Sequence, residues 1–286
     1  MRRLKLAYAL CGNAYTEAVA RLFFANCCLL IHRSNVKKAK DRINRQGIFL
    51  LALLGRYTIF LLPRFEFCIA IPHSANKYNF ALRILRPHKI YLIDDGVTFE
   101  YWSDFHNVNI AKIIERYFDC IELIGPRLPK WPSTYKSLTV NIVSRKEAVS
   151  KLLFLLPKTE YDFGFDKVKN LESVCVLDDG QFSMEILKKI ADDFKIFCES
   201  EHCFILMHPS RRDDSMRYPA EIFIVNNSKN IKAVYGKASA ALFNIYANNP
   251  HINCYSSSMT DEILNESLRE TGIKILSWSI HDGFCK

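Results

Sequence analysis

One short stretch, residues 89–102, constrains the fold of this chain more than any other. It contains an apolar, β-rich run, Ile90–Ile93, that stops abruptly at Asp94, Asp95 and Gly96. This pattern is typical of a buried parallel strand that delivers two carboxylates to its own C-terminal end, with a glycine turn behind them. In open α/β sheets, ligands bind in the crevice beyond the strand ends. The stretch therefore predicts an α/β fold with a site at the edge of its sheet.

The two adjacent acids have a catalytic interpretation and a structural one. Carboxylates at such an edge repel each other and lose part of their hydration, so one of them can hold a raised pKa. A carboxylate of that kind is suited to taking a proton from a substrate hydroxyl. The alternative is that Asp94 or Asp95 caps the following helix or forms an Asx turn, which is the commoner use of an isolated Asp-Asp-Gly.

The rest of the chain alternates apolar strands with helical patterns, which predicts doubly wound parallel sheets. Each predicted strand ends in small or polar residues, as loops that face a ligand require. The predicted strands of the first half are 4–10, 27–32, 57–62, 65–71, 90–93 and 120–124, and its helices are 14–24, 36–54, 78–85, 110–118 and 144–155. The predicted strands of the second half are 173–177, 203–207, 221–226, 231–235 and 251–255, and its helices are 184–197, one that opens near 239, and 261–270.

A polar, aromatic and irregular segment at 157–170 is predicted to be the linker between two domains. The domains are accordingly placed at residues 1–160 and 171–286, each with a Rossmann-like parallel sheet. Two such units, with strand ends facing a central cleft from both sides, form the GT-B layout of many glycosyltransferases.

Composition limits the partners and the compartment. A net charge of +9 fits nucleic acid, an anionic membrane surface or an anionic substrate. Nucleic acid is the weakest of these partners, because no helix-turn-helix, zinc-finger or RNP signature accompanies the charge. The 10 cysteines are scattered through apolar runs, as the buried free thiols of a cytoplasmic protein are. The longest apolar run, 48–62, is broken by Gly55 and Arg56 and is shorter than the roughly 20 residues that cross a bilayer.

Two motifs of the second half have functional interpretations. His208 and Pro209 follow a predicted strand, where an imidazole can protonate a leaving phosphate or can simply end the strand. The small residues around Gly236 and Ser239 open a helix, where free N–H groups can bind a phosphate or the small side chains can allow close packing. A zinc site is rejected for the set Cys198, His202, Cys203 and His208, because these intervals follow no pair-of-pairs pattern.

Taken together, four segments resemble a known family in their order and spacing. They are Ile71–Tyr78, Tyr91–Gly96, Met207–Asp213 and Tyr235–Leu242, which contain an Asp-Asp-Gly, a His-Pro and a serine turn in that order. This order resembles the bacterial sialyltransferases, in particular the lipooligosaccharide sialyltransferases of glycosyltransferase family 52 and their polysialyltransferase relatives. The resemblance spans 67–242 in ordered pieces and has little identity.

The resemblance implies a role for each matching residue. Asp94 corresponds to the general base on the acceptor hydroxyl, His208 to the group that assists departure of CMP, and Ser239 to the serine that holds its phosphate. The implied donor is CMP-sialic acid, which needs neither a metal nor another cofactor, and the reaction inverts the anomeric carbon. The candidate donor-binding residues are Pro209, Ser239, Gly236, Glu221 and Asp179, and the candidate acceptor-binding residues are Ser74, Asn76, Asp95 and Gly96.

The same resemblance gives the expected setting and its alternatives. The acceptor is expected to be galactose on a lipooligosaccharide, capsule or O-antigen glycan. Independently of the resemblance, the basic residues of the N-terminal half predict a cytoplasmic enzyme held at the anionic inner face of the membrane. A homodimer is left open. Because no acid follows Phe223 where the family has Phe-Glu, Glu221 is only a candidate substitute, and CMP-Kdo or a catalytically idle glycan-binding relative stays an alternative. Asp178 and Asp179 form a second Asp-Asp-Gly with Gly180 and rival Asp94 as the base.

Overall fold

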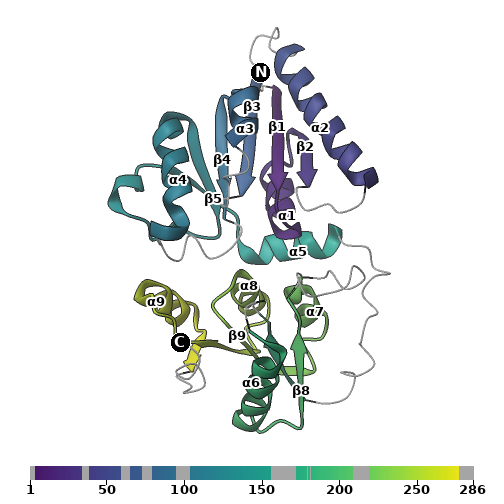
Figure 1. Ribbon diagram of the computed structural model, residues 1–286, viewed down its shortest axis with the longest axis vertical. Coiled ribbons are helices and arrows are strands. Elements are labelled where there is room, and N and C mark those ends of the chain that lie inside the picture. The colour runs from purple at the N-terminus through teal and green to yellow at the C-terminus, as the bar shows by residue number, and fades with distance from the viewer. Residues whose placement is uncertain are drawn as a thin grey trace. The chain divides into compact units, whose positions relative to one another are not determined.

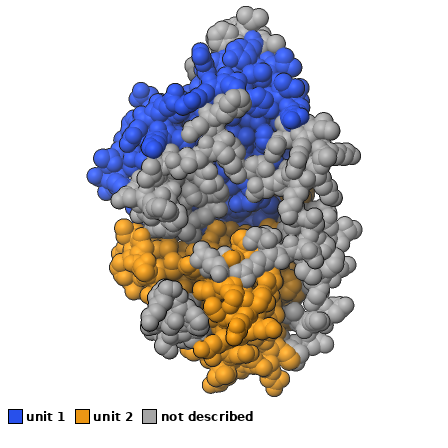
Figure 2. Space-filling model, in the orientation of Figure 1, with its two compact units in different colours: residues 1–152 blue, residues 153–286 orange. Residues whose placement is uncertain are grey.

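The computed structural model describes residues 4–33, 39–58, 65–72, 79–94, 104–155, 172–178, 180, 182–208 and 219–276. The chain divides into two compact units, Met1–Leu152 and Leu153–Lys286, coloured separately in Figure 2. The described part of each unit is built on a parallel sheet of its own (Figure 1). The linker predicted at 157–170 lies outside the described residues.

In the first unit, the described strands form a six-stranded sheet in the order β2-β1-β3-β4-β5-β6. Every neighbouring pair is parallel, so all strands end at the same edge. The chain turns from β2 to the other side of β1 when it forms β3, which makes the β1–β3 junction the switch point of this sheet. The strands are β1 (Leu4–Cys11), β2 (Cys28–Arg33), β3 (Phe65–Pro72), β4 (Lys89–Ile93), β5 (Ile121–Gly125) and β6 (Thr139–Ile142).

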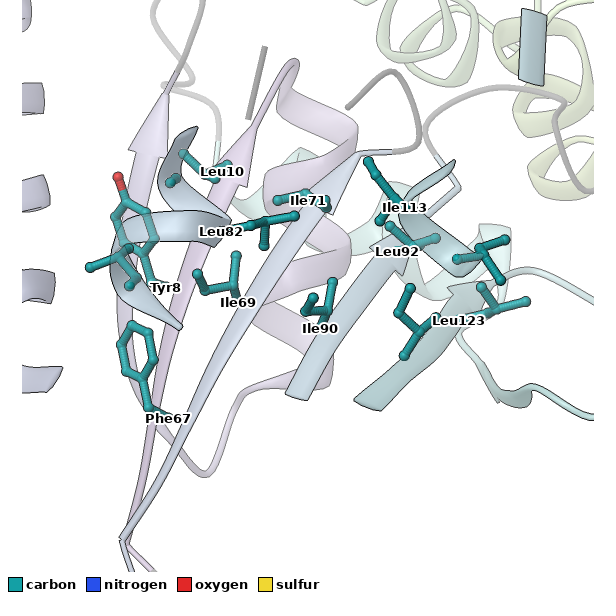
Figure 3. Close-up of a cluster of buried hydrophobic side chains, with 14 of the residues drawn as sticks. Tyr8, Leu10, Phe67, Ile69, Ile71, Leu82, Ile90, Leu92, Ile113 and Leu123 are labelled. Atoms are coloured by element: carbon teal, nitrogen blue, oxygen red, sulfur yellow. The ribbon is translucent and has the colours of Figure 1, made fainter. Parts of the chain in front are cut away.

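Alternating side chains of these strands fill two cores, one on each face of the sheet. Tyr8, Ile69 and Leu92 lie in one core, which Figure 3 shows, whereas their neighbours Ala7 and Ala70 lie in the other. Because both faces are covered, the strands read as continuous apolar runs. Helices α2 (Ala39–Thr58), α3 (Asn79–Leu85) and α4 (Asp104–Tyr117) cover the first face, and α1 (Ala14–Phe23) and α5 (Arg145–Leu155) cover the second.

In the second unit, the described strands form a five-stranded parallel sheet in the order β11-β10-β9-β7-β8. Its switch point lies between β7 and β9, since β8 follows on one side of β7 and β9 on the other. The strands are β7 (Ser173–Leu177), β8 (His202–Leu206), β9 (Ile231–Gly236), β10 (Asn253–Ser257) and β11 (Lys274–Leu276). The helices are α6 (Met184–Phe197), α7 (Ala220–Asn226), α8 (Ala240–Asn248) and α9 (Glu262–Thr271).

The predicted α/β class with parallel sheets is confirmed, but two predicted strands are wrong. Residues 221–226 form helix α7, because Pro219 stands at its N-cap and its apolar side chains pack towards α8 instead of entering a ladder. Tyr57 and Thr58, predicted to start a strand, complete helix α2, and 59–62 lie outside the described residues. Strands β6 and β11 were not predicted; they are short edge strands with weak apolar runs.

Candidate functional site

Asp94 lies at the C-terminal edge of the first sheet, directly after β4. Its backbone N–H donates to the carbonyl of Ile124 at 2.9 Å, which extends the β4–β5 ladder by one residue. The residue is 2% exposed, so a carboxyl group is buried at the end of an interior strand. A group held there by the sheet itself has a fixed position, which is what a general base requires.

Helix α1 begins at the same edge, at the switch point of the first sheet. Asn13 caps it, accepting from the backbone N–H of Thr16 at 2.8 Å, while the Thr16 hydroxyl contacts the Asn13 backbone in return. This capping box was missed in the sequence, although Asn followed three residues later by a side chain that can bond back is its signature. Burial raises the pKa of the neighbouring Cys11 thiol to about 12, so this thiol stays protonated.

An ion-pair cluster around the buried carboxylate of Glu17 ties the end of β2 to α1. Glu17 is 6% exposed and accepts from Arg33 Nε at 2.7 Å and Nη2 at 2.9 Å, and from Arg21 Nε at 3.0 Å. Burial raises the pKa of Glu17, but the hydrogen bonds and charges of Arg33 and Arg21 outweigh it and leave this pKa below its ordinary value. The cluster was also missed, because nothing in the sequence pairs Glu17 with a residue sixteen positions later.

In the second unit, Asp178 holds the backbone of the His208 loop. Asp178 directly follows β7 and is 6% exposed. Its Oδ1 accepts from the backbone N–H of Gly180 at 2.7 Å, and its Oδ2 accepts from the backbone N–H of His208 at 3.0 Å. The first bond is the Asx turn expected of an Asp-Asp-Gly, with Gly180 at φ 81°. Both carboxylate oxygens are thus engaged with main chain, which is a structural role and leaves Asp94 as the candidate base.

His208 lies two residues beyond the end of β8, at the C-terminal edge of the second sheet. Its side chain is half-buried. The Asp178 carboxylate fixes its main chain at the point where the chain leaves the strand. An imidazole on such an anchored loop can act on a group bound beyond the strand ends.

Ser239 and Gly236 lie at the switch point of the second sheet. Ser239 is the N-cap of α8, its Oγ accepting from the backbone N–H of Leu242 at 3.4 Å. A Cβ on Gly236 would come within 3.2 Å of Leu177 Cβ, so the ends of β9 and β7 approach closely. Close packing of the two strands therefore explains why a glycine occupies position 236. The N-terminus of α8 supplies main-chain N–H groups beside it.

Glu221 lies in the first turn of α7 and is 6% exposed. Its Oε1 accepts from Asn244 Nδ2 at 3.3 Å, which joins α7 to α8. Asn244 is 0% exposed and was missed in the sequence, because an asparagine within an apolar helix carries no motif. The predicted site residues Ser74, Asn76, Asp95, Gly96, Asp179 and Pro209 lie outside the described residues.

The rejected zinc set does not come together as a ligand group. Cys203 has a free thiol, and burial raises its pKa to about 12. Within the described ranges, no cluster of three or more His, Cys, Asp or Glu side chains is placed to hold a metal ion. No helix in the described part of the chain is both long and apolar enough to cross a membrane.

No protein-family model matches this chain, and no curated protein does either. Solved structures do match over nearly its whole length. A sialyltransferase from Photobacterium damsela has a TM-score of 0.51 and 11% identity, with 96% of this chain and 82% of that chain covered. A 2,6-sialyltransferase from Photobacterium sp. JT-ISH-224 has a TM-score of 0.52 and 11% identity, with 95% of this chain and 78% of that chain covered. The fold is GT-B.

The GT-B match rests on backbone arrangement, since 11% identity carries no residue-level correspondence. The second of these structures is a ternary complex with the donor product CMP and the acceptor substrate lactose. In this chain, Asp94 follows β4 at the C-terminal edge of the first sheet. Asp178 and His208 follow β7 and β8 at the C-terminal edge of the second sheet, where they are hydrogen-bonded to each other.

Proposed function

We propose that this chain is an inverting sialyltransferase that moves sialic acid from CMP-sialic acid to a terminal sugar hydroxyl. The observation that carries the proposal is the position of Asp94 and His208, each at the C-terminal edge of its own parallel sheet in a GT-B fold. Both of the solved structures described above are sialyltransferases. Ligands of doubly wound sheets bind at this edge.

In the proposed reaction, Asp94 accepts the proton of the acceptor hydroxyl as its oxygen attacks the anomeric carbon of sialic acid. The bond from that carbon to the CMP phosphate oxygen breaks on the opposite side, so the configuration inverts. His208 donates a proton to the departing phosphate, and CMP leaves as the second product. Burial suits Asp94 to this role, since a buried carboxyl group is shielded from competition by bulk water.

The donor phosphate is assigned to the N-terminus of α8. Ser239 caps this helix, and Gly236, which has no side chain of its own, lies three residues before the cap. Helix N-termini attract phosphate because their N–H groups and dipole favour negative charge. Glu221, held by Asn244, is assigned to the donor nucleoside, together with Pro209 and Asp179.

The finer features of the proposal follow from the motif resemblance. They are membership of glycosyltransferase family 52, galactose on a lipooligosaccharide or capsule as acceptor, and Ser74, Asn76, Asp95 and Gly96 as acceptor contacts. The reaction needs no metal, because CMP already activates the anomeric carbon. Action at the cytoplasmic face of the membrane completes the proposal.

The test is release of CMP from CMP-sialic acid by the purified protein, with and without lactose. We expect lactose to stimulate release, and Asp94→Asn and His208→Ala each to lower it by about 10²-fold or more. Asp192→Asn removes an exposed carboxylate on α6, and His202→Ala removes an exposed imidazole from the other end of β8. Both controls are expected to keep the wild-type rate.

Other outcomes of this experiment separate the alternatives. CMP binding without release from CMP-sialic acid would redirect the assignment to another donor such as CMP-Kdo. CMP binding without release from either donor would indicate an idle relative. Absence of CMP binding would overturn the proposed function.

A further inference from the structure

Helix α2 carries an apolar face whose side chains are more than half exposed. Leu50, Leu51, Leu54 and Tyr57 are 55%, 55%, 57% and 59% exposed. Residues three, four and seven positions apart lie on one side of a helix, so these side chains form a single stripe. Gly47 belongs to the same side, and a Cβ built on it would meet nothing within 4 Å. The stripe therefore extends for about three turns of the helix.

The opposite side of α2 already packs on the core. Ala52 is 0% exposed, and Ile48, Phe49 and Leu53 pack against the same cluster of buried residues. In Figure 1, α2 lies beside the edge strand β2. The C-terminal half of the helix is thus apolar on both sides, although one side suffices to hold it on the sheet. A helix that is apolar all round is normally buried all round.

Positive charge borders the stripe at both ends. On its N-terminal side, the first turns of α2, residues 39–45, contain three basic residues and one acid. At its C-terminal end, Tyr57 Oη donates to the Ile84 carbonyl at 3.2 Å and Arg56 Nε donates to the Leu85 carbonyl at 3.1 Å, and these bonds join α2 to the end of α3. Arg83 and Arg86 at that end are exposed.

We infer that this face of α2 docks the protein onto an anionic lipid bilayer. Leucines and a tyrosine flanked by basic residues are the composition of a helix that lies in the interface plane of a membrane. The basic residues are attracted to anionic headgroups while the leucines enter the acyl boundary. A second copy of the chain is a poorer occupant, because four partly exposed side chains offer far less than the roughly 800 Å² per partner of a stable interface.

The inference names the surface behind the membrane setting of the proposed function and rests on that setting alone. It is tested without any substrate, so its failure is distinguishable from failure of the transferase activity. The full chain is floated with vesicles of phosphatidylcholine alone and of phosphatidylcholine with phosphatidylglycerol. We expect binding to the anionic vesicles, weakened by added salt, and little binding to the neutral ones. Leu50→Ser/Leu54→Ser is expected to weaken binding to anionic vesicles by about tenfold or more. Circular dichroism melting is expected to show an unchanged Tm, since both leucines are more than half exposed.

The matched control is Leu128→Ser/Ile196→Ser, which removes two leucine-sized side chains that are 69% and 74% exposed outside α2. This variant is expected to bind anionic vesicles as the wild type does. Equal weakening in both double variants would overturn the assignment to α2. Absence of vesicle binding by the wild type would overturn the inference. If sedimentation then showed that Leu50→Ser/Leu54→Ser dissociates a dimer, the occupant of this face would be a second copy of the chain.

Discussion

The carboxylate of Asp178 accepts a 3.0 Å hydrogen bond from the backbone N–H of His208, thirty residues later in the chain. The same carboxylate closes the turn at Gly180. Because β7 and β8 are neighbours in the sheet, one buried acid can shape the loops that follow both strands. A hydrogen bond from main chain to an ionised acceptor is stronger than one between neutral groups. Asp178 is therefore a positioning residue for His208, in contrast to the catalytic role assigned to Asp94.

Asp178→Ala is expected to lower the turnover number for CMP release by about tenfold to a hundredfold while the KM for the acceptor stays unchanged, because the imidazole loses its fixed position. The measurement is a double-mutant cycle with His208→Ala. If Asp178 acts through His208, adding Asp178→Ala to His208→Ala causes no further loss. Multiplying losses would mean that Asp178 acts independently of the imidazole.

Asn265→Ala is the matched control for this cycle. Asn265 is 3% exposed and clamps the loop after β10, bonding both the N–H and the carbonyl of Met259 at 2.9 and 2.8 Å. A comparable loss of turnover in this variant would show that any loosened loop at this edge lowers the rate. Amide hydrogen exchange at His208, which is expected to accelerate in Asp178→Ala, tests the clamp even if the chain has another substrate.

Gly236→Ala is expected to reduce the free energy of unfolding by about 1 kcal/mol, because the added methyl group overpacks the contact between β9 and β7. A Cβ at this position lies 3.2 Å from both Cβ and Cδ1 of Leu177. Urea unfolding of Gly236→Ala, Leu177→Ala and the double variant checks the cause. If crowding by Cγ and Cδ1 of Leu177 is the cause, Gly236→Ala costs less in the Leu177→Ala background, although the Cβ contact remains there; a strictly additive result would rule out crowding by Cγ and Cδ1.

The sequence was sufficient for most of the fold where a strand or helix had a strong local pattern. The run ending at Asp94 is a buried strand, and Ser183 and Asp261 cap α6 and α9 as their positions indicate. It was insufficient at 221–226, where six mostly apolar residues fit a strand or a helix equally well. Packing against helix α8 determines that this segment is a helix, and the local pattern carries no information about that contact.

The candidate site likewise has parts that local sequence patterns predict and parts that they do not. The positions of Asp94 and His208 at strand ends follow from local patterns, because each apolar run stops just before them. The bond from Asp178 to the His208 main chain depends on which strands are neighbours, and no spacing in the sequence encodes that order. The ion pair of Glu17 and Arg33 likewise requires β1 and β2 to be paired.

Two glycines are expected to respond oppositely to replacement by alanine. Gly272 ends α9 at φ 85°, and a Cβ there would lie 2.3 Å from Tyr246 Oη, so Gly272→Ala is expected to cost about 2 kcal/mol of unfolding free energy. Gly47 is inside α2 with nothing within 4 Å, so Gly47→Ala is expected to stabilise by about 1 kcal/mol. Thermal melts of the two variants measure the difference, and a destabilising Gly47→Ala would contradict the open face of α2.

The pH dependence of stability is expected to report the cluster of Glu17, Arg33 and Arg21. The pKa of Glu17 is lowered from 4.5 in the folded chain, so the folded state holds the ionised form more strongly than the unfolded state does. The contribution of Glu17 to stability is therefore present above pH 4.5 and is lost as the pH falls through the lower folded pKa. Glu17→Gln is expected to cost about 2 kcal/mol at pH 7, a figure reduced from that of a fully buried pair because Arg33 is exposed.

Urea unfolding of wild type and Glu17→Gln as the pH is lowered tests this sign directly. The two free energies of unfolding are expected to approach each other below pH 4.5 and to converge below the lowered folded pKa, because the protonated wild-type side chain then resembles glutamine in charge. Glu262→Gln is the control: Glu262 bonds Arg269 at 2.7 Å and its pKa is also lowered, chiefly by that hydrogen bond, but its side chain is 75% exposed. Solvent screens such a pair, so its loss is expected to change stability little at any pH. A gap between wild type and Glu17→Gln that stays constant into acid would mean that packing of Glu17, and not its charge, holds the end of β2 against α1.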